Sequence, residues 1–153
     1  MAKPTLPPLV ARERVVRACV ARFREKKRQY GSVDCVKSTV FVLRKAGVKI
    51  PFLKGKTYGS RATAKAILEQ TGCATLVDCM DALGLTRIAP LATLPGDIIA
   101  LPVPEGDPFG ASLLIVHTAG AHRVFGFDPQ DSRFRVGVPE LAACLAAWRV
   151  PHG

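Results

Sequence analysis

The sequence has no long hydrophobic run. In its 153 residues no stretch of about 18 consecutive apolar residues occurs, so we expect no membrane-spanning helix. Residues 1–8 contain three prolines and lack the apolar core of a secretory signal. We therefore expect the chain to be made in the cytoplasm without a signal peptide, and to leave the cell only as part of a larger particle.

Cysteine and histidine are both scarce. The five cysteines are odd in number, and no two of them have the C-x-x-C spacing of a zinc or redox motif. The sequence therefore predicts no metal and no organic cofactor, and we expect most cysteines to be buried as small hydrophobic residues. The only histidines are His117, His122 and His152, so few side chains can act as a base at neutral pH.

The rest of the composition is that of a folded protein. Apolar residues make up 48% of the chain and charged residues 22%, as in ordinary globular domains. The length suits one domain with a sizeable core. We predict a Pro-rich extended arm over residues 1–11 and a single domain over residues 12–153.

Acidic residues are few, and the excess positive charge lies near the N-terminus. The net charge is +10, and residues 12–28 hold eight Arg or Lys against two Glu. Such a stripe can attract nucleic acid or an acidic protein face, or it can be the solvated face of a helix. We name Arg22, Arg24 and Lys26 as candidate contact residues. Phe23 is the one aromatic side chain among these charges, and helical spacing places it on the apolar face, which disfavours nucleic acid as the partner.

The order of the predicted elements is helices first and strands afterwards. Apolar spacing and capping residues predict helices over residues 12–28, 35–46, 61–71 and 76–83. Short β-like runs follow at 98–101, 112–117, 122–127, 134–138 and 148–150, with a short helix over 139–146. Segregated helices and strands predict an α+β fold, in which N-terminal helices pack on a small antiparallel sheet.

The segment 31–35 reads Gly-Ser-Val-Asp-Cys and leads directly into the apolar helical stretch from Val36 to Ala46. It places Cys35 in the first turn of a helix, where backbone N–H groups and the helix dipole favour a thiolate. Cys35 is therefore the candidate nucleophile, and a buried core thiol is the alternative interpretation. We interpret Asp34 as the cap of this helix.

Two further motifs follow in order. They are Pro95-Gly96-Asp97 before the strand 98–101, in which Asp97 is interpreted as a turn former, and the apolar hairpin 112–127. With Tyr-Gly-Ser-Val-Asp-Cys at 30–35, these motifs resemble the NlpC/P60 superfamily of papain-like cysteine peptidases, and in particular its small phage tail-associated branch. The resemblance covers roughly residues 28–128 and implies a papain-like architecture.

In that family the cysteine attacks a peptide carbonyl, usually in peptidoglycan, and a histidine on the strand after Pro-Gly-Asp acts as the base. Cys35 matches the cysteine. The position of the histidine falls near Ala111 or Ser112, and that of the orienting polar residue falls near Val124. His117 is the substitute base that we name, although it lies roughly 17 Å beyond Ser112 along an extended strand. The resemblance therefore implies a peptidase fold that is catalytically degenerate.

These observations favour a structural or assembly protein of a phage tail tip or baseplate. The expected partners are other tail proteins, and the expected location is the virion. The first alternative is an active peptidase or amidase that cleaves peptidoglycan during phage entry, and its weakness is the missing histidine. The second alternative is a basic nucleic-acid-binding protein, which rests on the charge of residues 12–28 alone.

Overall fold

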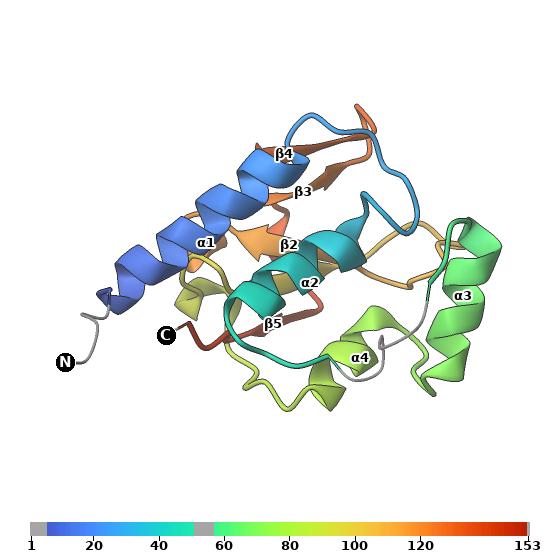
Figure 1. Cartoon of the computed structure of the whole chain (residues 1–153), viewed down its shortest axis with the longest axis horizontal. Coiled ribbons are helices and arrows are strands. Elements are labelled where there is room, and N and C mark those ends of the chain that lie inside the picture. The colour runs from blue at the N-terminus through green and yellow to red at the C-terminus, as the bar shows by residue number, and fades with distance from the viewer. Residues whose placement is uncertain (1–5, 51–56, 153) are drawn as a thin grey trace.

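The computed structural model describes residues 6–50 and 57–152, in which a layer of helices packs against one five-stranded sheet (Figure 1). The helices are α1 Pro8–Phe23, α2 Cys35–Lys45, α3 Arg61–Gln70 and α4 Leu76–Ala82. The strands are β1 Ile98–Leu101, β2 Ser112–Val116, β3 Val124–Asp128, β4 Arg133–Gly137 and β5 Ala146–Trp148. All four helices precede the first strand, so the predicted α+β class is confirmed.

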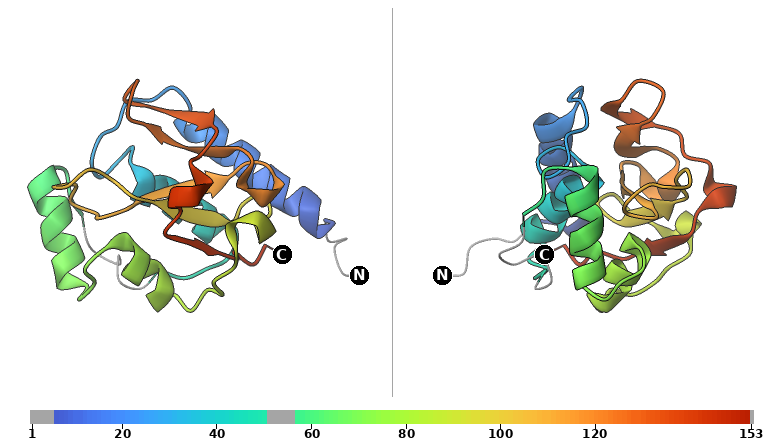
Figure 2. Two further views of the ribbon diagram at one scale, coloured as in Figure 1. Left: turned by 180° about the vertical axis from the view of Figure 1, so that it is seen from behind. Right: turned by 90° about the vertical axis from the view of Figure 1, so that its right-hand side faces the viewer.

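The sheet has the strand order β4-β3-β2-β1-β5, and every neighbouring pair is antiparallel. Helices α1 and α2 cover one face of it, as the edge-on view of Figure 2 shows. Because side chains alternate across a strand, Leu113 and Ile115 of β2 pack into the helix-facing core. Leu114 and Val116 join a smaller apolar cluster on the opposite face.

Helix α2 is the central helix, as predicted, and seven of its 11 residues are buried. It begins at Cys35 because the side chain of Asp34 accepts a hydrogen bond from the backbone N–H of Lys37. It ends where Gly47 adopts a φ of +83°, a left-handed conformation that suits glycine. The start of α2 is therefore fixed on the sheet, and Cys35 is fixed with it.

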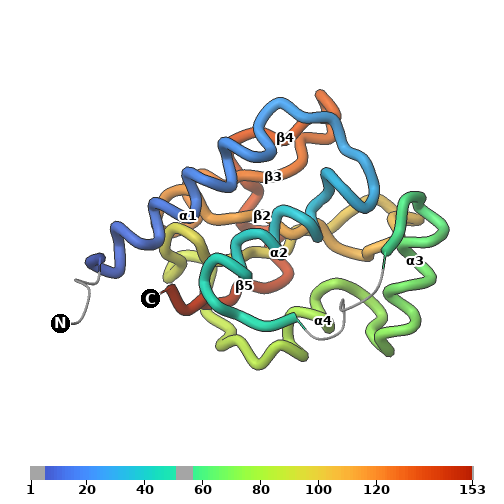
Figure 3. The backbone as a smooth tube through the Cα atoms, in the orientation of Figure 1, coloured from blue at the N-terminus to red at the C-terminus, as the bar shows by residue number. Residues whose placement is uncertain are grey.

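The first helix differs from its predicted bounds at both ends. It begins at Pro8, so residues 8–11 are helical and do not belong to an extended arm; residues 1–5 of the predicted arm lie outside the described residues. It ends at Phe23 because the backbone that follows pairs with β4. The N–H of Glu25 donates to the carbonyl of Phe134, and the N–H of Phe134 donates to the carbonyl of Lys26. Figure 3 shows this segment passing beside β4 before it turns into α2.

The helix predicted over residues 139–146 is wrong. A single 3-10 turn occupies Leu141–Ala143, and β5 already begins at Ala146. The N–H of Leu145 donates to the carbonyl of Ala100 in β1, so the sheet uses a backbone group that a longer helix would have needed. Pairing with β1 overrides the local helical preference here.

No helix within the described residues is long and apolar enough to cross a membrane.

The five cysteines are all free. Cys19, Cys35 and Cys79 are buried, and Cys73 and Cys144 are half-buried.

Candidate functional site

The carboxylate of Asp34 organises the start of α2. Besides capping the helix at Lys37, it accepts hydrogen bonds from the backbone N–H of Gly31 at 2.8 Å and from the hydroxyl of Tyr58 at 2.7 Å. Asp34 is fully buried, and these donors replace the water that it loses. The prediction that Asp34 caps the helix is confirmed. Tyr58 was missed because it lies 24 residues further along the chain, where no local pattern connects it with Cys35.

The thiol of Cys35 is buried, with 8% of the residue exposed. Its pKa is raised to about 12, mainly by burial, and the charges of Asp34 and Asp107 act in the same direction. A hydrogen bond to the backbone of Leu113 and the charge of Arg28 act in the opposite direction, but loss of hydration is the largest effect. Burial therefore opposes the thiolate expected at this helix start, and it favours the alternative interpretation of Cys35 as a buried core thiol.

A pocket of about 490 Å³ lies beside Cys35. The start of α2, the loop 102–111 and the end of the β3–β4 hairpin form its wall. Tyr30, Phe109 and Phe127 supply aromatic surface, and Arg28 lies over the ring of Phe127 at 4.3 Å. The charged side chains in the wall are Arg28, Asp34, Arg61, Glu105 and Asp107.

Within the described residues, the wall of this pocket contains no histidine. His117 follows the end of β2 that lies away from the pocket, and its Nδ1 atom is buried without a hydrogen-bond partner among the described residues. His122 is exposed on the surface. The Nε2 atom of His152 lies 3.2 Å from the carbonyl oxygen of Gly96. The structure therefore does not bring His117, the predicted substitute base, to Cys35.

The positions expected for a base do reach the pocket. Ala111 and Ser112 both line it together with Cys35. Val124, the expected position of the orienting residue, pairs instead with Val116 at the far end of β2, and Phe127 is the β3 residue that lines the pocket. The start of β2 therefore lies at the pocket, whereas Val124 lies away from it.

Arg22, Arg24 and Lys26, the candidate contact residues, are exposed. Arg22 lies in the last turn of α1, and Arg24 and Lys26 lie in the segment that follows the helix. The basic surface that the three side chains form is therefore not the face of a single helix. Arg12 was counted with this basic stripe, and that interpretation is wrong. It is 6% exposed, and its guanidinium points into the domain. This surface is separate from the pocket, whose described wall contains none of these three residues.

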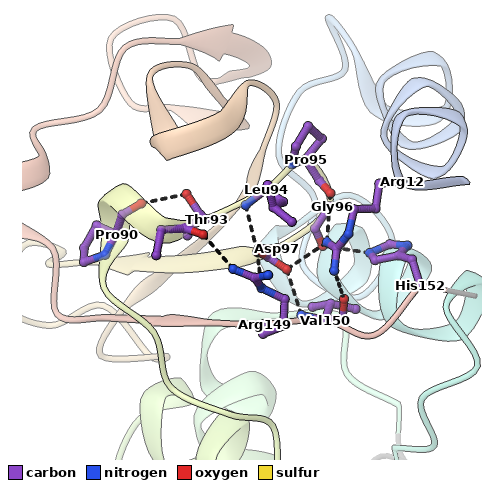
Figure 4. A network of polar contacts seen from close by, with 11 residues as sticks. Arg12, Pro90, Thr93, Leu94, Pro95, Gly96, Asp97, Arg149, Val150 and His152 are labelled. Carbon is purple, nitrogen blue, oxygen red and sulfur yellow. Dashed lines mark hydrogen bonds and ion pairs between the residues drawn. The ribbon is translucent and has the colours of Figure 1, made fainter. Parts of the chain in front are cut away.

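Asp97 of the Pro-Gly-Asp turn is the centre of a buried polar network, which Figure 4 shows. Its carboxylate accepts hydrogen bonds from the backbone N–H groups of Leu94 and Val150, each at 2.8 Å. It also forms ion pairs with Arg12 and Arg149, each at 3.0 Å. The turn-forming role predicted for Asp97 is confirmed, and the network additionally joins α1, β1 and the C-terminal segment. It does not take part in the pocket.

The fold and the site together define an α+β domain with a helix-borne, buried cysteine in the wall of a pocket. The family described as a domain of unknown function (DUF6950) matches residues 9–150, and the chain belongs to that family. No curated protein and no solved structure matches the chain.

Proposed function

We propose that this chain is a catalytically inactive, NlpC/P60-like domain that serves as a structural or assembly protein of a phage tail, at the tip or the baseplate. The observation that carries the proposal is the neutral, buried thiol of Cys35 beside a pocket whose described wall contains no histidine. The motifs at 30–35 and 95–97 support the phage tail assignment through their resemblance to the tail-associated branch.

A cysteine peptidase needs a thiolate and a group that protonates the leaving amine. With a pKa of about 12 for Cys35, only about one thiol in 10⁵ is ionised at neutral pH. A positioned acid–base side chain contributes about 10²–10⁴-fold to the rate, and Ala111 and Ser112 cannot supply it. The surroundings of Cys35 within the described residues therefore support a domain that has lost catalysis.

The basic surface of Arg22, Arg24 and Lys26 supports the assembly role. The three side chains are exposed and take no part in the hydrophobic core. They can therefore form ion pairs with an acidic face of a neighbouring tail subunit. Exposed charges at the rim of an interface chiefly steer association and fix its register. An acidic protein surface is therefore the partner chemistry that this surface fits.

Hydrolysis of purified peptidoglycan by the full chain tests the loss of catalysis. We expect no release of soluble fragments by the wild-type protein and the same result for Cys35→Ala, with Cys144→Ala as a control for the loss of a thiol elsewhere. Release of fragments that depends on Cys35 would overturn the proposal and establish the alternative, an active peptidase or amidase.

Tail particles of the phage that encodes the chain test the assembly role. We expect mass spectrometry to find the protein in purified tails at a fixed copy number, and particles with Cys35→Ala to remain infectious. Reversing the charge at Arg22, Arg24 and Lys26 to Glu should abolish incorporation, whereas Lys65→Glu on the exposed side of α3 should not. Absence of the protein from tails would overturn the assignment. Salt-dependent DNA binding by the wild type, lost in the triple variant, would favour the nucleic-acid alternative.

A further inference from the structure

The imidazole of His152 packs against the Pro-Gly-Asp turn before β1, at the border of the buried network of Asp97 (Figure 4). Its Nε2 atom lies 3.2 Å from the carbonyl oxygen of Gly96. Because a carbonyl oxygen only accepts hydrogen bonds, we assign the hydrogen to Nε2, which leaves Nδ1 as a bare acceptor. Nδ1 is buried and has no hydrogen-bond partner among the described residues. The site therefore fits a neutral ring and offers no acceptor for a second N–H group.

The ring and the residue two positions before it attach one segment, residues 150–152, to the rest of the domain. A Cβ at Gly96 would lie 2.6 Å from Nε2 of His152, so the ring rests directly on the backbone of the turn. The backbone N–H of Val150 donates to the carboxylate of Asp97 at 2.8 Å. The carbonyl of Val150 accepts from the guanidinium of Arg12 at 2.7 Å. The segment 150–152 therefore joins α1 to the turn before β1.

The charges around the ring oppose a further positive charge. The charged groups that act on it are Arg12 from α1 and Asp97 from the turn, and Arg149 on its own segment pairs with Asp97. Asp97 is thus already paired with two guanidinium groups, and a protonated His152 would be a third cation beside one carboxylate. Burial lowers the pKa of His152 below its ordinary value, and the charge of Arg12 acts in the same direction. The hydrogen bond to the turn carbonyl and the charge of Asp97 act in the opposite direction.

We propose that His152 is an acid-sensitive latch, whose protonation releases the segment 150–152 from α1 and from the turn before β1. The proton added at Nδ1 finds no acceptor among the described neighbours of the ring, and the imidazolium regains hydration when the segment leaves. Because the pKa of the packed ring lies below 6.5, its contribution to stability is complete above pH 6.5 and is lost as the pH falls through the lower value. Release also removes the Val150 carbonyl from Arg12, so it weakens the attachment of α1.

Hydrogen exchange of the wild-type chain at about pH 7 and about pH 4.5 tests the proposal. The Val150 amide, which donates to Asp97, should lose roughly tenfold of its protection factor at the lower pH. The Ile115 amide lies between β1 and β3 in the middle of the sheet and should keep its protection. Proton NMR should show that the ring of His152 titrates at a lower pH than the exposed ring of His122.

Two matched variants assign the response to one ring. His152→Gln does not titrate, and its amide can still donate to the carbonyl of Gly96, so the protection of Val150 should become independent of pH. His122→Gln removes an exposed histidine and should behave as the wild type.

Unchanged protection of Val150 in the wild type would overturn the proposal, and this result does not depend on the folding of any variant. An equal loss at Ile115 would also contradict it, because the whole domain would then be unfolding. A loss at Val150 that persists in His152→Gln would assign the response to another group and exclude the latch.

Discussion

The guanidinium of Arg12 lies 3.0 Å from the carboxylate of Asp97, and both side chains are buried. The two residues are separated by 85 positions in the sequence. The same guanidinium donates to the carbonyl of Pro95 at 3.1 Å and to that of Val150 at 2.7 Å. This pair therefore joins the first helix, the turn before β1 and the C-terminal segment.

Replacing Asp97 with Asn should destabilise the protein strongly. The change leaves the buried cation of Arg12 without its counter-charge, and removal of one partner of a buried ion pair costs about 3–5 kcal/mol. Urea unfolding measures the effect. The control is Glu25→Gln, which breaks the exposed ion pair with Arg135 and should leave the unfolding midpoint unchanged. Equal midpoints for the two variants would contradict the structural role of Asp97.

Gly31→Ala should destabilise the start of α2 more than Gly47→Ala does. Both glycines have a left-handed φ, of +89° and +83°, so each substitution costs about 1–2 kcal/mol in backbone strain. A Cβ at Gly31 would also lie 1.8 Å from the carbonyl oxygen of Tyr58, whereas nothing lies within 4 Å of one at Gly47. Thermal unfolding of the two variants measures the difference, and a similar loss in both would show that the chain near Tyr58 moves away freely.

Alkylation of Cys35 should be slow at neutral pH and should accelerate up to about pH 12. Burial raises the pKa of this thiol to about 12, and only the thiolate reacts. Iodoacetamide labelling from pH 6 to 10, followed by peptide mapping, gives the rate at each cysteine. A rate at Cys35 that levels off below pH 8 would mean that a base ionises this thiol, in conflict with the proposed loss of catalysis.

Alkaline pH should destabilise the folded protein. Burial raises the pKa values of Cys19, Cys35 and Cys79 from 9.0 to about 12 in the folded state. Their contribution to stability is therefore complete below pH 9, and it is lost as the pH rises from 9 to about 12. Urea midpoints across this range measure the loss, and Cys35→Ser should reduce its slope. A flat profile would show that these thiols titrate normally in the folded chain.

The fluorescence of Trp148, the single tryptophan, should report on Asp81. The indole N–H donates to Asp81 at 2.9 Å, and hydrogen bonds from Arg87 and then Trp148 lower the pKa of this carboxyl to about 2. The stability that Asp81 contributes is present above its ordinary pKa of 3.8 and is lost as the pH falls through 2. We expect an emission change near pH 2 that Asp81→Asn removes; a midpoint near 4 would contradict the hydrogen bond.

Where the signals were local, the sequence predicted the structure well. Asp34 caps its helix as short polar side chains do, and β1 occupies the predicted residues 98–101. The predicted C-terminal end of the first helix and the helix predicted over 139–146 were wrong because backbone groups there pair with distant strands. Such pairing depends on residues over 40 positions away, which local periodicity does not contain.

The sequence by itself determined that helices precede strands, that Cys35 begins the central helix, and that no histidine occurs at the position expected for a base. These properties follow from hydrophobic spacing, capping and residue identity, which act over a few positions. Only the tertiary structure decided that Cys35 is a neutral thiol, that Arg12 is buried against Asp97, and that Tyr58 completes the site. Burial and charge pairing depend on the whole chain, because each is set by what the fold packs around a side chain.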